Sequence, residues 1–124
     1  MSYPVCTLKE GRERSLYNRH PWIFSGAIES IDPQIETPQL VDVRGSKGQF
    51  LARGYFNPNS QIRIRILTFK DEPVDARFFA DRFRYASNWR QTILGQGSDS
   101  YRLINAEGDS MPGLIVDRYG DFLV

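Results

Sequence analysis

Apolar and polar residues alternate along a short segment near the middle of the chain. Ile62, Ile64 and Ile66 share one face of an expected strand, and Arg63 and Arg65 share the other, because side chains of a strand point to opposite faces with a period of two. The pattern predicts one face in a core and one that is wet and positively charged.

Short apolar segments separated by turn residues fill the rest of the first half. Strands are expected over residues 4–8, 40–43 and 49–56, with a turn between the last two that is typical of a hairpin. A short helix is expected within residues 10–20, ended by Pro21, because the residue before a proline is disfavoured in the helical region. Loops are expected at 32–38 and 57–60.

After residues 71–73 the apolar period changes to three or four, which predicts one long helix. Asp75 is its expected N-cap and Gly95 its end, and its aromatic side chains are expected to be core contacts. A strand over 101–105, a turn-rich connection over 107–113 and two further strands over 114–117 and 122–124 follow. The fold class expected is therefore mixed α/β, mainly β.

The chain ends inside the last of these apolar strands. Chain termini tend to be polar and loosely held, so the ending predicts either an N-terminal piece of something longer or a closing edge strand.

Composition places the chain among soluble globular proteins. It has 124 residues, of which 40% are hydrophobic and 25% charged, and it has neither a long apolar span nor the apolar core of a signal peptide. We therefore expect a cytoplasmic protein. The single cysteine, Cys6, excludes an internal disulfide, and with the single histidine, His20, it excludes a zinc site built only from these residue types.

The net charge of +1 conceals two halves of opposite sign. Residues 1–70 hold ten basic side chains and six acidic ones, whereas residues 71–124 hold six and nine. Thirteen of the sixteen cations are arginine, which suits planar recognition of phosphate and stacking on bases. The asymmetry favours a nucleic-acid partner, and the alternative is an ordinary solvated surface.

No complete active site is visible in the sequence. A nucleophilic pair of Cys6 and His20 lacks an orienting third group, and neither a dinucleotide-binding fingerprint nor a P-loop occurs. Turn chemistry accounts for Asp109 and Asp121, which lack the spacing of a calcium loop. No metal is expected.

Binding residues are better represented than catalytic ones. Arg12, Arg14 and Arg19 lie close together and are followed by His20 and Trp22, a mixture of cations and rings that suits phosphates and unpaired bases. The alternatives are ion pairs of the arginines with neighbouring acids, and a core position for the tryptophan. Arg63 and Arg65 could likewise pair with acids across the sheet.

The chain resembles a known family at several segments. In the first half these are GRERSL at 11–16, RHPWIFSGAI at 19–28, LARGYFNP at 51–58 and SQI at 60–62, and in the second half DSYRLI at 99–104, EGD at 107–109 and MPGLIVDRYG at 111–120. They are similar to the N-terminal PUA domain and the start of the central domain of the bacterial large-subunit ribosomal RNA cytosine-C5 methyltransferases, which use S-adenosylmethionine (SAM).

This resemblance implies a PUA-like β-barrel over residues 1–70, followed over 71–124 by the beginning of an α/β domain with a long helix and a β-hairpin. It implies ribosomal RNA as the partner, SAM as the cofactor of the full-length enzyme, and a homodimer formed through that enzyme. The Rossmann-like catalytic domain is missing here, so the chain alone should recognise RNA without methylating it.

With the charge asymmetry, the resemblance predicts an RNA-binding surface formed by Arg12, Arg14, Arg19, His20, Lys47, Arg53, Arg63 and Arg65. The alternative is a protein-interaction module whose basic face docks onto the rest of the enzyme, with RNA bound elsewhere.

Overall fold

The computed structural model describes residues 3–32 and 35–124, which form two compact units. Unit 1 is Met1–Glu72 and unit 2 is Pro73–Val124, so the division falls two residues after the boundary expected from the sequence. Each unit is described by itself. The structure confirms the expected mixed α/β, mainly β fold class.

Unit 1 is built on a six-stranded sheet with the strand order β2-β6-β5-β4-β1-β3. Neighbouring strands are antiparallel except β1 and β4, which are parallel. The elements are β1 (Val5–Leu8), α1 (Arg14–Tyr17), β2 (Trp22–Phe24), the 3-10 turn η1 (Ser25–Ala27), β3 (Ile28–Asp32), β4 (Gln39–Arg44), β5 (Phe50–Phe56) and β6 (Ile62–Thr68).

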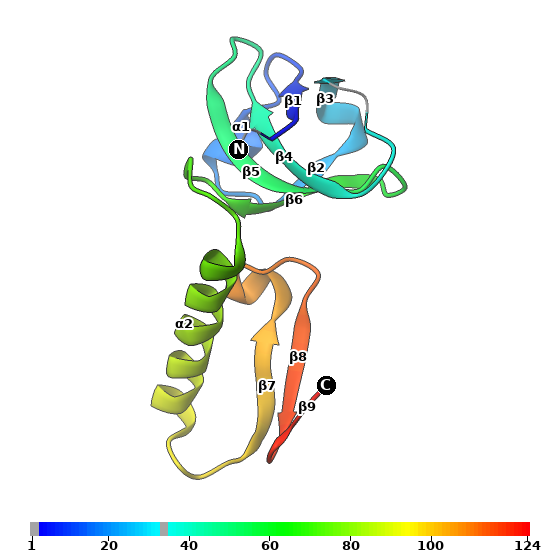
Figure 1. Ribbon diagram of the computed structural model, residues 1–124. Helices are drawn as coiled ribbons and strands as arrows, with labels where there is room; N and C mark the ends of the chain where they lie inside the picture. Colours follow the sequence, from blue (N-terminus) through cyan, green and yellow to red (C-terminus); the bar gives the residue numbers. More distant parts are fainter. Residues whose placement is uncertain (1–2, 33–34) are drawn as a thin grey trace. The chain divides into compact units, whose positions relative to one another are not determined.

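The connection between β2 and β3 makes this sheet curl. These strands lie at the two ends of the strand order, yet only the three residues of η1 separate them. A flat sheet would hold its two edge strands apart, so the sheet must bend until its edges meet at η1 (Figure 1). The Lys9 N–H donates a 2.9 Å hydrogen bond to the Ala27 carbonyl, which joins the end of β1 to η1. The result is the expected barrel in a partly open form.

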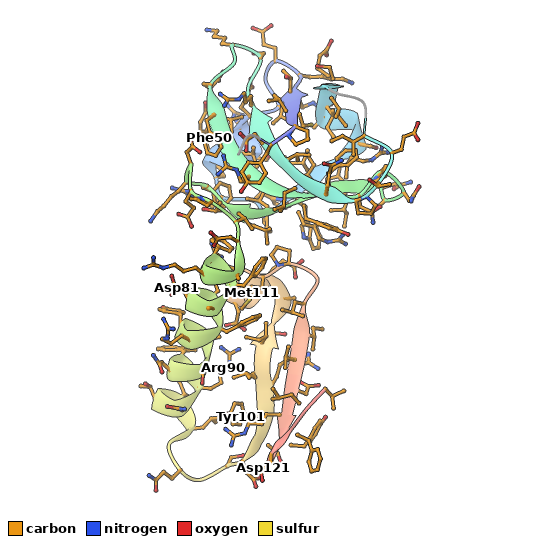
Figure 2. The ribbon with its side chains drawn as sticks, in the orientation of Figure 1. Phe50, Asp81, Arg90, Tyr101, Met111 and Asp121 are labelled. Atoms are coloured by element: carbon orange, nitrogen blue, oxygen red, sulfur yellow. The ribbon has the colours of Figure 1, made fainter. Side chains whose placement is uncertain are left out.

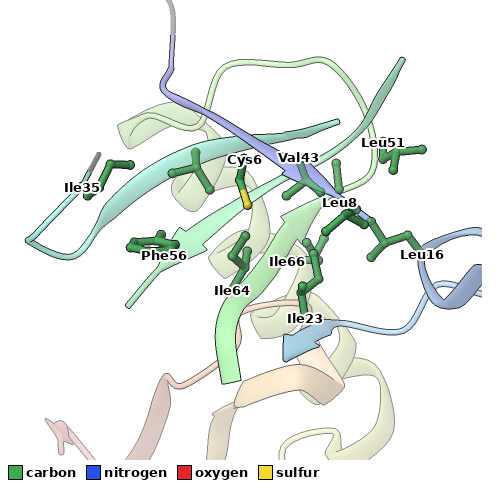
Figure 3. Close-up of a cluster of buried hydrophobic side chains, with 12 residues drawn as sticks. Cys6, Leu8, Leu16, Ile23, Ile35, Val43, Leu51, Phe56, Ile64 and Ile66 are labelled. Carbon is green, nitrogen blue, oxygen red and sulfur yellow. The ribbon is translucent and has the colours of Figure 1, made fainter. Parts of the chain in front are cut away.

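The concave face of the curled sheet holds the core of unit 1. Cys6, Val43 and Ile64 are fully buried there (Figure 3). The expected alternation along β6 is confirmed from Ile64 to Ile66, which are buried on either side of the half-buried Arg65. Ile62 is only half-buried, as is Arg63, because the β2–β6 register shifts at this end of the strand. Burial raises the pKa of the Cys6 thiol to about 12, so at neutral pH it is a packing residue and not a nucleophile.

Arg53 lies inside unit 1 rather than on its surface. Its guanidinium donates to Asp42 Oδ1 at 2.6 Å, to Asp71 Oδ1 at 2.8 Å and to the Glu72 carbonyl, and it lies over the ring of Tyr3. The hydrogen bond to Asp42 is the main cause of its raised pKa. Arg53 is only 5% exposed, and its guanidinium donors are already bonded within the protein. We therefore remove Arg53 from the predicted RNA-binding set.

Unit 2 packs one long helix on a small antiparallel sheet of order β7-β8-β9. The helix α2 spans Ala76–Leu94; it is followed by β7 (Ser100–Asn105), the 3-10 turn η2 (Ala106–Asp109), β8 (Ile115–Tyr119) and β9 (Phe122–Leu123). The predicted caps are confirmed, since Asp75 accepts a 2.9 Å hydrogen bond from the Phe78 N–H and Gly95 ends the helix at φ 60°.

The expectation that the aromatic residues of α2 are core contacts is only partly met. Phe78 is buried and Phe79 packs on the cluster around Ala86, but Trp89 is 53% exposed. Its neighbour Arg90 turns toward β7 instead (Figure 2) and pairs with the Asp109 carboxylate through two 2.7 Å hydrogen bonds. The hydrogen bonds from Arg90 are the main cause of the lowered pKa of Asp109.

No helix among the described residues has both the length and the apolar character needed to cross a membrane.

Gly54 gives a test of how closely β5 and β6 pack. A Cβ atom built at this position would lie 2.5 Å from the Arg65 carbonyl oxygen, a backbone atom that cannot rotate away. We expect Gly54→Ala to lower the free energy of unfolding by about 1–3 kcal/mol, measured by urea denaturation followed by tryptophan fluorescence. The control is Gly26→Ala, because a Cβ there meets nothing within 4 Å. Equal urea midpoints for the two variants would contradict the packing described.

Candidate nucleic-acid interface

An open groove of about 460 Å³ runs along α1 and β2 in unit 1. We call it the α1–β2 groove. Its lining combines cations, polar groups and flat rings, contributed among others by Arg12, Arg14, Asn18, His20, Trp22 and Phe24. Three of the residues predicted from the sequence, Arg12, Arg14 and His20, therefore lie at one site.

The chain between α1 and β2 turns sharply, which aims β2 at its partner strand. The helix ends at Tyr17, before Pro21 as expected, and Arg19 adopts the left-handed conformation at φ 62°. The His20 N–H donates to the Ser15 carbonyl at 2.9 Å. The Pro21 carbonyl then accepts from the Ile66 N–H at 2.7 Å. The pairing with β6 therefore begins at the residue just before β2.

The Glu13 carboxylate fixes α1 against the turn between β4 and β5. Its Oε1 accepts from both the N–H and the hydroxyl of Ser46 at 3.1 Å, and its Oε2 accepts from the Gly11 N–H at 2.9 Å. These hydrogen bonds, led by that from the Ser46 backbone, lower the pKa of Glu13. Both oxygens of the Glu13 carboxylate are therefore engaged by backbone and hydroxyl donors, and it forms no ion pair with Arg12 or Arg14 in the described residues.

The arginines of the groove have no carboxylate partner among the described residues. No ion pair in residues 3–32 and 35–124 includes Arg12 or Arg14. Pairing with Glu10 or Glu13, the alternative left open by the sequence, is therefore not observed in the described part of the chain. Two guanidinium groups at the groove remain available to an anion.

The rings of β2 line the groove because of the strand's alternation. Ile23 is 3% exposed and points into the core, so Trp22 and Phe24 on either side of it point outward. Trp22 is half-buried and contacts His20 edge to face, with 6.1 Å between ring centroids, and Phe24 is 50% exposed. The core position considered for Trp22 is thus wrong in part, since its ring forms a groove wall.

A row of side chains continues from the groove across the outer face of the sheet. Arg65 on β6 lies opposite Trp22 on β2 and opposite Tyr55 on β5. Residues directly opposite in antiparallel strands share a face, so Arg65 stands between two aromatic residues across the three strands. Arg65, like Arg12, is in no ion pair with a described residue.

The remaining predicted residues lie apart from the groove. Arg19 lies over the Phe69 ring, 4.8 Å from its centroid, and Lys47 is in the turn beside Ser46. Arg63 lines a second pocket, near η1 and β3. Asn18 and Phe24 were missed by the sequence analysis, although the alternation around Ile23 would have identified Phe24.

Metal chemistry has no candidate site in the part of the chain that the structure describes. No group of three or more histidine, cysteine, aspartate or glutamate side chains is arranged there to hold an ion.

Unit 1 is a small β domain in which a curled sheet carries a one-turn helix, with a groove lined by cations and rings along that helix. A profile of the PUA-like domain matches residues 6–69, and the chain belongs to the PUA-like domain family.

Curated relatives extend the similarity over nearly the whole chain. The "Ribosomal RNA large subunit methyltransferase I" of Salmonella arizonae is 47% identical over 99% of this chain, and that of Salmonella gallinarum is 46% identical over 98%. The chain spans 31% of the length of each of these relatives. A solved Streptococcus mutans structure, described as a SAM-dependent methyltransferase, shares the fold with a TM-score of 0.79 at 22% identity, covering 99% of this chain and 32% of that one.

Glu13 makes the stability of the fold depend on pH. A carboxyl whose pKa is lowered by folding contributes stability above its ordinary pKa, here 4.5, and that contribution is lost as the pH falls through the folded value. We expect Glu13→Gln to unfold at a lower temperature than the wild type at pH 7, and the difference to shrink between pH 5 and pH 3. Thermal unfolding followed by circular dichroism measures this. A constant difference over that pH range would show that the Glu13 charge does not stabilise the fold.

Proposed function

We propose that this chain is the RNA-binding part of a longer SAM-dependent ribosomal RNA methyltransferase, acting in the cytoplasm. The names and the identity of the curated relatives support this class of enzyme, and the family of unit 1 supports its role within the enzyme. Within this proposal the methylated atom is the C5 of a cytosine, which the resemblance at residues 11–28 and 99–120 implies.

The α1–β2 groove is the observation that carries the RNA-binding role. Its two unpaired arginines supply positive charge to phosphates, and the rings of Trp22 and Phe24 supply flat surfaces for unpaired bases. Arg65 extends the positive charge along the sheet from Trp22. A single-stranded or looped segment of RNA matches this combination better than a regular duplex, because duplex bases stack on one another and leave no face for the rings.

The chain's own residues bind and orient RNA in this proposal and do not handle the cofactor. SAM supplies the methyl group in the full-length enzyme. The chain has no glycine-rich turn between a strand and a helix to receive the cofactor, and its only cysteine is buried in the core, so the residues present do not fit SAM. We assign the cofactor and the chemical step to the remainder of such an enzyme.

The double variant Arg12→Ala/Arg14→Ala tests the groove. Loss of two phosphate contacts should weaken binding of a fluorescein-labelled single-stranded RNA of mixed sequence and reduce the slope of log affinity against log salt by about 1.4. Fluorescence anisotropy at several salt concentrations measures both quantities.

Arg77→Ala/Arg84→Ala is the matched control for this experiment. It removes the same charge from exposed positions of α2 in unit 2, so its affinity and salt slope should match the wild type. If the control loses as much affinity as the groove variant, binding depends on net charge and the groove is not the RNA site.

A further inference from the structure

A second pocket of about 470 Å³ lies where the two ends of the curled sheet meet. Residues of η1 and β3, including Ile28, Glu29 and Ile31, line one side, and Phe56 and Arg63 of the β5–β6 region line the other. We call it the seam pocket. In the described residues β3 pairs only with β1, so the pocket occupies the place where the barrel stays open.

The seam pocket has the volume of a small-ligand site and a mixed polar and apolar lining. Its volume falls within the range of about 300–1,000 Å³ that such sites occupy, and Ile28, Ile31 and Pro58 contribute apolar surface to it. Glu29 and Arg63 add a hydrogen-bond acceptor and a donor. They form no ion pair with each other, so each is available to a ligand.

Arg63 is held in place at this pocket. The β2–β6 register shifts beside it, because Ile23 is opposite Ile64 whereas Phe24 is opposite Ile62, and such a bulge re-aims a side chain. Its Nε donates to the Ser60 carbonyl at 2.9 Å, which fixes the plane of the guanidinium. Its two terminal nitrogens donate to no other described residue, which leaves a planar pair of donors.

The seam pocket is adjacent to the α1–β2 groove along the chain. Phe24 lines the groove and Ser25, the next residue, lines the pocket; likewise Ala27 lines the groove and Ile28 the pocket. The exposed turn η1 is therefore the ridge between them, and a strand bound in the groove has only to cross η1 to reach the pocket.

We propose that the seam pocket binds one unstacked guanine of the RNA strand whose phosphates lie in the α1–β2 groove. Guanine presents O6 and N7, two acceptors for a guanidinium fork, and its N1–H and N2 amino group suit the carboxylate of Glu29. The proposal rests on the proposed function and adds a base preference to it.

The test compares short oligouridylate RNAs that carry guanosine, adenosine or an abasic site at one internal position. Binding to the full chain is measured by fluorescence anisotropy. We expect the guanosine RNA to bind at least about fivefold more tightly than the other two, the low end of what a good bidentate base contact provides. Arg63→Lys should keep most of the affinity but lose this preference, because a lysine has no planar fork.

Further variants separate the pocket from the groove. Arg12→Ala/Arg14→Ala should weaken all three RNAs equally and keep the guanosine preference. Gly26→Glu places a negative charge on the η1 ridge, where a side chain meets nothing within 4 Å, and should reduce the preference; Gln96→Glu, exposed in unit 2, is its control.

The two proposals fail in different ways. If the wild type binds all three RNAs but equally, or if Arg63→Lys retains the preference for guanosine, the seam pocket is not a guanine site and the groove is unaffected. If none of the RNAs binds, the proposed function itself fails, and the guanine site fails with it.

Discussion

The η1 turn imposes the constraint on which the rest of unit 1 depends. Three residues join strands at opposite ends of a six-stranded order, so the sheet has to curl until those ends meet. The curl encloses a core around Cys6 and Ile64. It also places α1 beside the outward-facing rings of β2, which forms the groove, and leaves a seam beside β3, which forms the second pocket.

Local patterns predicted most of the elements but not which arginines are on the surface. The isoleucine alternation and the Asp75 cap are local signals; the cap was confirmed, and the alternation was confirmed from Ile64 to Ile66 but not at Ile62. Arg53 and Arg90 look no different in the sequence from arginines on the surface. In the structure each is held by an acid distant in sequence: Asp42, 11 residues from Arg53, and Asp109, 19 residues from Arg90. Such pairs depend on strand register and helix position, which the sequence pattern does not encode locally.

The groove could be anticipated only in part for the same reason. Arg12, Arg14 and His20 are neighbours in sequence and remain neighbours in the fold. Arg65 joins them only because β6 pairs with β2 at Trp22, and Arg63 is directed to the other pocket by a bulge in that pairing. Glu13 lies between the two arginines in the sequence but does not pair with them. Its carboxylate accepts hydrogen bonds from Ser46 and Gly11 instead.

The most direct test of the central claim is a map of backbone amide shifts of the ¹⁵N-labelled chain during titration with single-stranded RNA. The account predicts that the amides of residues 11–27, with Arg65 and its neighbours on β6, shift together and saturate with one affinity. Shifts confined to the β4–β5 hairpin or to unit 2, with residues 11–27 unchanged, would contradict it and would favour a protein-docking role for the basic face.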